Sequence, residues 1–259
     1  MNNKYHYLKL KNILGLSIQI TKADFILRNE GSYIGILWYL INPILTFGLL
    51  FFIFSDRLGN DINHYPVYLL LGIIIFNFFQ STTIESTKLI ISDNNSLIKS
   101  INFPKESLIV SIVMKNLISH FFEILLFSCL LIYFHINVLL IIFYFPILLL
   151  LVIFILGTSM ILSSLTVFFV DLDNIWNFLI RLIWLGTPIF YSIAGQTKLF
   201  YFNIFNPLYY YITATRDIII YQVKPENWIL LGMIGFSLSA LLIGFLIFNK
   251  LKNKIPELI

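Results

Sequence analysis

His120 and Glu123, inside a long apolar run, are the pair most able to do chemistry in this sequence. Their spacing of three residues places both side chains on one face of a helix, where they could bind a metal ion or hold a proton. One pair supplies too few ligands for a metal site, so we favour a hydrogen-bonded structural pair. The other histidines, His6, His64 and His135, are scattered, and none is followed by a ligand three or four residues later.

The motifs of nucleotide-binding and hydrolytic enzymes are missing. The sequence contains no G-x-x-x-x-G-K-[ST], no H-E-x-x-H and no G-x-S-x-G. Asp171 and Asp173 are close together in the chain, but they lie in a short segment between two apolar runs. Cys129 is the only cysteine, which excludes an intrachain disulfide and a cysteine-based metal cluster. We therefore expect no enzyme activity, no nucleotide site, no metal and no cofactor in this chain.

The composition indicates an all-α integral membrane protein of one domain, residues 1–259. Hydrophobic residues make up 59% of the chain, charged residues only 12%, and the mean hydropathy is +0.88. A soluble domain has about a quarter of its residues charged. The net charge of +4 is small and belongs to the loops, so no nucleic-acid partner is expected.

Six apolar runs are long enough to cross a bilayer, which takes about 20 helical residues each. We expect a six-span bundle over residues 37–249, after a cytoplasmic segment 1–36 and before a cytoplasmic tail 250–259. The fourth run is too long for one straight crossing, so either Pro146 and Gly157 divide it or its ends project beyond the lipid. The runs are Leu37–Ser55, Pro66–Glu85, Ser107–Phe134, Val138–Val170, Trp176–Ser192 and Trp228–Phe248.

Lysine and arginine predict which side of the membrane each loop faces. The segments 1–36, 86–106 and 250–254 carry eleven of these residues together, whereas the loops on the other side carry four. Both termini and the stretch Thr87–Glu106 are therefore expected in the cytoplasm. Residues 4–28 interleave apolar residues with lysines and predict an amphipathic helix, which lies in the headgroup plane or packs on the cytoplasmic ends of the spans.

The cytoplasmic stretch Thr87–Glu106 predicts a short docking helix. Leu97, Ile98 and Ile101 form one apolar stripe, and Pro104 would end the helix. A short amphipathic helix with basic neighbours suits docking onto a cytoplasmic partner. A solvated connecting loop is the alternative.

The outer segment, residues 193–227, is half apolar and rich in tyrosine and phenylalanine. Pro207 divides it into two pieces, each too short to span, which suggests a re-entrant or interfacial helical hairpin. The aromatic side chains either anchor the chain at the membrane boundary or stack against sugar rings.

Three charges lie within the apolar runs, and intramembrane charge is a functional hypothesis by default. Lys115 and Arg181 are near the cytoplasmic ends, so both can extend to the membrane surface. Glu123 is nearer the middle, where we favour a hydrogen-bonded residue that faces a neighbouring helix.

Four ordered stretches carry a family resemblance. In Arg28 to Pro43, the residues Arg28, Ser32, Gly35, Trp38 and Pro43 are in register with a pattern R-Y-K-x-S-x-L-G-x-x-W followed by proline, with Asn29 and Glu30 as departures. The other stretches are Asn102-Phe103-Pro104, Thr187-Pro188-Ile189-Phe190-Tyr191, and Asn206-Pro207-Leu208 followed by Arg216. Together they resemble permease subunits of type-2 ABC exporters of the O-antigen, teichoic acid and capsular polysaccharide class. Val170-Asp171 stands where that family often has Arg-Asp.

The resemblance implies a half-transporter of the bacterial cytoplasmic (inner) membrane. Two copies form the pathway as a homodimer, a pair of separate ATPase subunits binds below with ATP and Mg, and the substrate is a lipid-linked polysaccharide. The expected ATPase-coupling residues are Leu97, Ile98, Ile101, Asn102, Phe103, Pro104, Asp171 and Asp173. The expected substrate-pathway residues are Arg28, Trp38, Tyr191, Tyr209, Tyr210 and Tyr211, with Arg28 meeting the lipid pyrophosphate.

Two other functions fit the sequence less well. A type-2 ABC permease for a drug, peptide or lipid has the same length and topology, but the aromatic outer segment favours a polymer. A membrane-embedded enzyme acting on lipid-linked sugars would need a cluster of carboxylates, histidines or a metal near one membrane face, and this chain offers only the two pairs named above.

Overall fold

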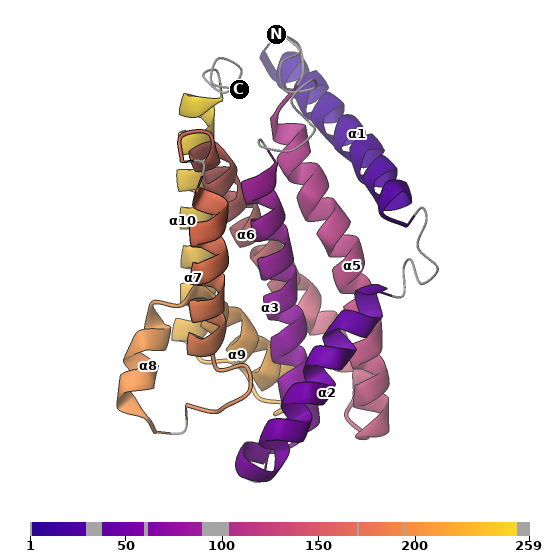
Figure 1. Cartoon of the computed structure of the whole chain (residues 1–259), viewed down its shortest axis with the longest axis vertical. Helices are drawn as coiled ribbons and strands as arrows, with labels where there is room; N and C mark the ends of the chain where they lie inside the picture. The colour runs from indigo at the N-terminus through magenta and orange to yellow at the C-terminus, as the bar shows by residue number, and fades with distance from the viewer. Residues whose placement is uncertain are drawn as a thin grey trace.

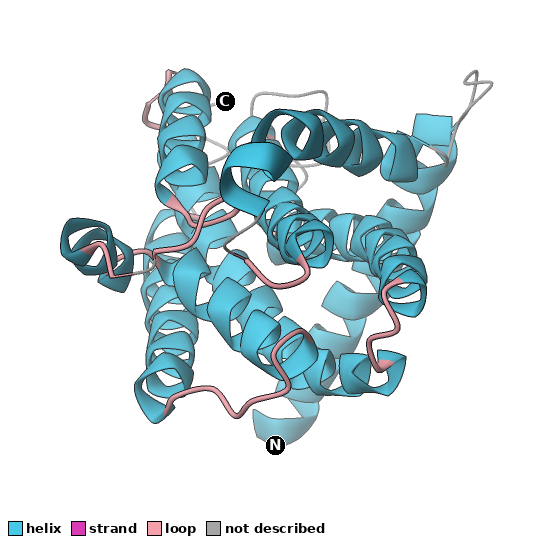
Figure 2. Cartoon of the chain, turned by 90° about the horizontal axis from the view of Figure 1, so that it is seen from below, coloured by secondary structure: helices cyan, strands magenta, loops and turns pink. Residues whose placement is uncertain are grey.

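A computed structural model describes residues 2–29, 38–59, 62–89, 104–169, 171–193 and 195–252 of the chain. Every element in these residues is a helix, and no strand occurs among them (Figures 1 and 2). The elements are α1 Asn2–Asn29, α2 Trp38–Leu58, α3 Tyr65–Lys88, α5 Glu106–Tyr133, η3 Val138–Phe143, α6 Tyr144–Thr166, α7 Leu172–Gly186, α8 Thr197–Ile204, α9 Pro207–Ile219 and α10 Asn227–Leu251. The all-α prediction is confirmed.

Five segments of the described chain are long and apolar enough to cross a membrane. They are α2, α3, α5, the continuous segment Val138–Thr166 and α10, and they match five of the six predicted runs. The run predicted at Trp176–Ser192 differs, because α7 ends at Gly186 and a bent, non-helical stretch follows it. Pro188 explains this end, since it restricts Thr187 to extended backbone.

The fourth run forms one continuous helical segment that changes from a 3-10 helix to an α-helix at Tyr144, and neither Pro146 nor Gly157 divides it. A 3-10 helix over Val138–Phe143 leads into α6, in which Pro146 is the third residue and is tolerated in the first turn. Gly157 lies inside the uninterrupted α6, so the suggestion that it divides the run is wrong. Gly157 instead lets another helix approach.

That close approach joins α6 to α10. A Cβ on Gly157 would fall inside the backbone of Ala240, and a Cβ on Gly244 would fall against the carbonyl of Gly157. Small residues at helix contacts are typical of membrane proteins, in which lipid supplies no hydrophobic force between helices. The two helices therefore meet backbone to backbone.

The central helix is α3, which packs against α2, α5, α6, α7 and α9 (Figure 1). Among the 18 most apolar consecutive residues of α3, 78% are buried, whereas only 11% of the corresponding residues of α2 are buried. A helix that is apolar all round and buried on every side belongs to the interior of a bundle. The apolar faces of α2 and α7 are open in the single chain.

The helix α1 runs beside α5 and in the same direction. The Ser17 hydroxyl donates to the Ser107 carbonyl at 3.1 Å, and the Thr21 hydroxyl donates to the Ser111 carbonyl at 3.3 Å. Both pairs are 90 residues apart in sequence, so α1 and α5 are parallel and keep the same register over this helical turn. A helix covers the predicted residues 4–28 and packs beside α5, whereas its amphipathic character and its place in a headgroup plane stay predictions.

The two ends of the bundle differ. The start of α1, the end of α3, the start of α5 and the end of α10 lie together at one end, at the top of Figure 1. The short helices α8 and α9 lie toward the opposite end, where α8 stands away from the bundle. Two helices divided at Pro207 are what the sequence predicts for the outer segment.

Candidate functional site

The stretch Thr187–Tyr191 after α7 is bent and not helical, so most of its carbonyls need hydrogen-bond donors from outside a helix. Four successive carbonyls instead accept from side chains of other helices. Arg216 donates to Pro188 at 2.6 Å and to Ile189 at 2.9 Å. Tyr65 donates to Phe190 at 3.0 Å, and Tyr68 donates to Tyr191 at 2.8 Å. Side chains of α3 and α9 thus supply the hydrogen bonds that a helix would otherwise give to these carbonyls. We call the carbonyls of residues 188–191, with their donors Tyr65, Tyr68 and Arg216, the carbonyl clasp.

Arg216, on α9, is the buried cation of the carbonyl clasp and is only 3% exposed. Its Cζ atom lies 3.3 Å from the centroid of the Tyr68 ring, and its Nη2 atom donates to the Tyr68 carbonyl at 2.9 Å. Gly72 allows this, because a Cβ there would lie 2.7 Å from Arg216 Nη2. A buried charge is tolerated when hydrogen bonds and a ring face replace its water.

Asn206 ties the start of α9 to the same stretch. Its amide nitrogen donates to Thr187 Oγ1 at 2.7 Å, and its amide oxygen accepts from the Leu208 backbone at 3.2 Å. The second bond is a helix N-cap, and Pro207 follows at the first helical position, where proline is favoured. The resemblance motifs at 187–191 and 206–208 therefore meet in space through a side-chain contact.

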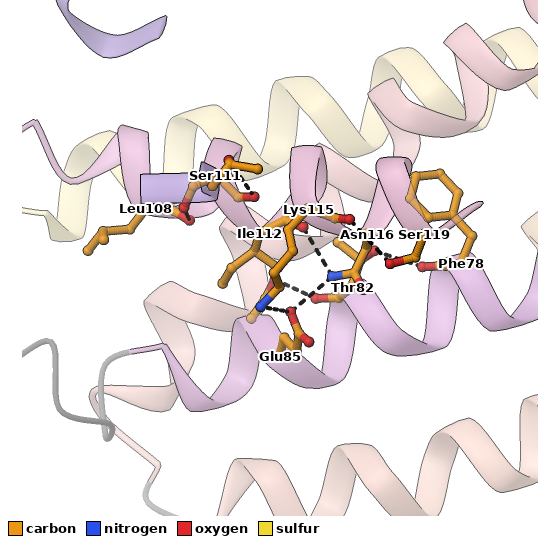
Figure 3. A network of polar contacts seen from close by, with 11 residues as sticks. Phe78, Thr82, Glu85, Leu108, Ser111, Ile112, Lys115, Asn116 and Ser119 are labelled. Carbon is orange, nitrogen blue, oxygen red and sulfur yellow. Dashed lines mark hydrogen bonds and ion pairs between the residues drawn. The ribbon is translucent and has the colours of Figure 1, made fainter. Parts of the chain in front are cut away.

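A second polar group joins α3 to α5 (Figure 3). Lys115 Nζ lies 2.8 Å from Glu85 Oε2, and Asn116 donates to the same carboxylate oxygen at 2.9 Å. Both charged side chains are mostly buried, at 14% and 30% exposed. Lys115 was expected to extend to the membrane surface, but it is paired with a neighbouring helix. Burial raises the pKa of Asp24 on α1, and the nearby charge of Lys115 partly opposes this rise.

The His120–Glu123 pair is buried between helices. His120 Nδ1 lies 3.1 Å from Glu123 Oε2, and His120 Nε2 lies 2.8 Å from the Tyr144 hydroxyl on α6. Phe78 of α3 stacks on the imidazole, with 4.8 Å between ring centroids. The favoured interpretation of a hydrogen-bonded pair facing a neighbouring helix is confirmed. Sequence spacing gave the pair but not Tyr144, which is 24 residues away.

Most of the predicted coupling residues, Leu97, Ile98, Ile101, Asn102 and Phe103, lie outside the described residues. Pro104 is described, and its carbonyl accepts from the Ser107 backbone at 2.9 Å. Asp171 is exposed at the start of α7. Asp173 accepts from the buried Thr87 hydroxyl of α3 at 2.7 Å, so it already has a partner within the chain.

The predicted pathway residues are dispersed. The side chain of Arg28 lies outside the described residues, Trp38 is 51% exposed at the start of α2, and the Tyr191 hydroxyl donates to the Gly186 carbonyl at 2.7 Å. The tyrosines of α9 are buried in the single chain, and the Tyr211 hydroxyl bonds Ser237 of α10 at 2.6 Å. The buried tyrosines are Tyr209, Tyr210 and Tyr211. A role for these residues in a substrate pathway stays a prediction.

An apolar cavity of about 420 Å³ lies between the bundle and the two short helices. Phe79 and Phe154 contribute from α3 and α6, and Phe202 and Phe205 stand at the edge of α8. Ile183, Asn206, Pro207 and Leu208 complete the lining. Its walls suit hydrocarbon or aromatic side chains, not a charged ligand.

Five long apolar helical segments, a non-helical stretch bonded by side chains of other helices and a pair of short helices define a multi-pass helical membrane protein. The ABC-2 type transporter family matches residues 17–220. The chain belongs to this family.

Named relatives match over almost the whole chain. An O-antigen export system permease protein RfbA of Klebsiella pneumoniae is 31% identical over 260 residues, covering 97% of this chain and 99% of the relative. A second RfbA of the same organism is 30% identical with the same coverage. The RfbA of Myxococcus xanthus is 25% identical over 247 residues, covering 94% of this chain and 95% of the relative.

Proposed function

We propose that this chain is the permease subunit of an ATP-driven exporter that moves a lipid-linked polysaccharide of the O-antigen type across the bacterial cytoplasmic membrane. The observation that carries the proposal is near full-length similarity to permeases named for O-antigen export. Two copies form the pathway, both termini face the cytoplasm, and a separate ATPase pair binds ATP and Mg. Teichoic acid or capsular polymers are the related cargo classes.

A composite sixth crossing supports this topology. The 15 residues of α7 span about 22 Å, and the non-helical stretch Thr187–Tyr191 would continue the crossing toward the hydrocarbon thickness of about 30 Å. Non-helical backbone at membrane depth must be hydrogen-bonded within the protein. The carbonyl clasp meets this requirement for residues 188–191.

The short helices α8 and α9 then form the re-entrant hairpin on the outer side, near the cavity. A test is cysteine accessibility, with Cys129→Ser as the background. Phe205→Cys should react in whole cells with a maleimide that cannot cross membranes, whereas Lys250→Cys should react only after the membrane is opened. Reversed labelling would overturn the orientation.

ATPase docking falls on the Leu97–Phe103 segment together with Pro104 and the exposed Asp171. The decisive experiment is co-purification from native membranes. A P-loop ATPase should co-purify in stoichiometric amount with the wild-type chain and with the matched control Ile101→Leu. It should be absent from the Ile101→Asp preparation. Retention of the ATPase and of export by Ile101→Asp would remove the docking assignment.

The cargo is tested separately, in proteoliposomes that contain the chain and its ATPase. Transport of a lipid-linked polysaccharide upon ATP addition, and of no comparable drug or peptide, is the expected result. Absence of any ATP-driven polymer transport by the wild-type pair would overturn the proposed function. In that case turnover of lipid-linked sugars by the purified chain would support the enzyme alternative.

A further inference from the structure

The cavity between α8 and the bundle has an inner wall of packed aromatic rings. Phe79 of α3 and Phe154 of α6 stack, with 5.7 Å between ring centroids and 17° between ring planes. Both side chains are buried, and Phe154 also packs on Tyr211 of α9. Phe79 and Phe154 lie in the central parts of segments that are long enough to cross a membrane. The inner wall is therefore at the depth of the hydrocarbon core.

The polar atoms of the cavity are already bonded. Asn206 is the only polar side chain among the described residues that line it. Its amide nitrogen donates to Thr187 Oγ1 at 2.7 Å and to Asn203 Oδ1 at 3.2 Å, and its amide oxygen accepts from the Leu208 backbone. A buried water needs about two to four polar partners, and a purely apolar cavity stays dry and binds hydrocarbon. The cavity therefore favours a hydrocarbon ligand over water.

The outer wall of the cavity is α8, which is held by few contacts. Phe202 and Phe205 line the cavity although they are 55% and 82% exposed. The ring of Phe202 lies on Gly186, where a Cβ would be 2.6 Å from the ring. Within α8, all of which is described, Asn203 is the only buried residue. The cavity is thus open beside α8 to the medium around the bundle.

A basic residue follows the same side of α8 as the two rings. Lys198, Phe202 and Phe205 are spaced by four and three residues, which places them on one helix face. The helix begins at the outer end and runs back toward the middle of the bundle, so its first turn is nearer the membrane surface (Figure 1). Lys198 is exposed and forms no ion pair with another described residue. A free cation above an apolar cavity is complementary to a phosphate group joined to a hydrocarbon chain.

The volume of the cavity suits one such chain. It is about 420 Å³, nearly three times the size of an apolar cavity of about 150 Å³ that binds benzene, so roughly 15 carbon atoms fit. A phospholipid offers a single acyl chain of about this size, and in a bilayer it is present at the open side of the cavity.

We propose that one acyl chain of an anionic phospholipid fills the cavity beside Phe79 and Phe154, with the lipid phosphate at Lys198. The bound chain supplies the apolar contacts that α8 lacks and holds this helix beside α7. This inference goes beyond the proposed function and does not depend on the cargo.

Photolabelling in proteoliposomes tests the cavity. The protein, purified from native membranes, is reconstituted in phosphatidylcholine with phosphatidylglycerol that carries a diazirine in the middle of one acyl chain. Illumination and peptide mapping should place the label on Phe79, Phe154 or Ile183. Ile183→Trp fills the cavity and should abolish this labelling, with Ile183→Phe as a smaller filling in case the first variant does not fold. Leu182→Trp is the matched control and should keep the labelling, because Leu182 is 48% exposed and does not line the cavity.

Competition by unlabelled lipids tests the phosphate contact. Phosphatidylglycerol should displace the labelled lipid better than phosphatidylcholine does, and Lys198→Gln should weaken this displacement about fivefold. Lys198→Arg keeps the charge and should behave as the wild type. Lys224→Gln, which removes another exposed lysine of the outer segment, should do the same.

Three results would overturn the inference. Label confined to the exposed Phe205, or equal labelling of Ile183→Trp and Leu182→Trp, would mean that lipid only surrounds α8. Equal competition by the two phospholipids would remove the phosphate contact at Lys198. Stronger competition by a polyprenyl phosphate than by phosphatidylglycerol would assign the cavity to a cargo lipid. Because labelling needs neither ATP nor export, failure of the export assay bears on the proposed function alone.

Discussion

Arg216 of α9 lies over the ring of Tyr68 of α3, with 3.3 Å between its Cζ atom and the ring centroid. The same guanidinium donates to three backbone carbonyls, those of Tyr68, Pro188 and Ile189. One side chain thus joins α3, α9 and the break after α7. The planar fork of arginine suits this, because it offers several donors in fixed directions.

Arg216→Lys should destabilise the protein by about 1–3 kcal/mol, since a single ammonium group cannot reach all three carbonyls and leaves buried acceptors unpaired. Thermal unfolding in detergent measures the effect. The exposed Arg57 supplies the control, and Arg57→Lys should leave the midpoint unchanged. Equal midpoints for the two variants would contradict the importance of the carbonyl clasp.

Tyr144→Phe should cost about 1–2 kcal/mol, because it leaves the buried His120 Nε2 without its 2.8 Å partner. Tyr133→Phe removes the same hydroxyl from a side chain that is 76% exposed, and should have little effect. Chemical denaturation of both variants in the same detergent gives the comparison. A larger loss for Tyr133→Phe would show that His120 is not held as described.

Lys115 and Glu85 should couple more strongly than a surface pair. Lys115→Met, Glu85→Gln and the double variant form a thermodynamic cycle, and we expect a coupling energy of about 1–2 kcal/mol, above the usual value for exposed pairs. The reason is the partial burial of both side chains. Strictly additive single effects would mean that the 2.8 Å contact contributes nothing.

Gly157→Ala should disrupt the contact between α6 and α10, because the added methyl group meets the Ala240 backbone, which cannot move aside as a side chain can. We expect a loss of about 1–3 kcal/mol, typical of overpacking. Gly235→Ala, in α10, adds its methyl group to open space and should stabilise the helix slightly. Opposite signs in the unfolding midpoint are therefore the expected result.

Asp217→Asn should flatten the dependence of stability on pH. Burial, with Glu226 acting in the same direction, raises the Asp217 pKa to about 6. A raised pKa in the folded state stabilises the protein below the ordinary value near 3.8 and loses that contribution as pH rises through about 6.

Asp217→Asn should consequently gain stability relative to the wild type between about pH 4 and 7, by about 1 kcal/mol after allowance for solvent screening of this half-buried group. Thermal midpoints of both proteins across that pH range measure it. A constant difference at every pH would contradict the raised pKa.

The membrane character and most helix positions were predictable from sequence, because hydropathy and length act locally. Five predicted runs match candidate spanning helices, and Pro207 divides the outer segment as expected. The end of α7 at Gly186 was missed, although Pro188 gave a local signal for it.

The candidate site was less predictable for a physical reason. Arg216 was noted only as part of a motif, and its acceptors are backbone atoms 27, 28 and 148 residues away. Backbone carbonyls are the same in every residue, so they leave no pattern of residue types to search for. His120 and Glu123 were found because both partners are side chains three residues apart.

The carbonyl clasp also sets rules for engineering chimaeras between related permeases. Its donors come from α3 and α9, while its acceptors belong to the stretch after α7. A graft of α8 and α9 from a relative preserves the break only if the incoming helix brings an arginine at the position of Arg216. The recipient must keep Tyr65, Tyr68 and Gly72, so the smallest exchangeable module is not contiguous in sequence.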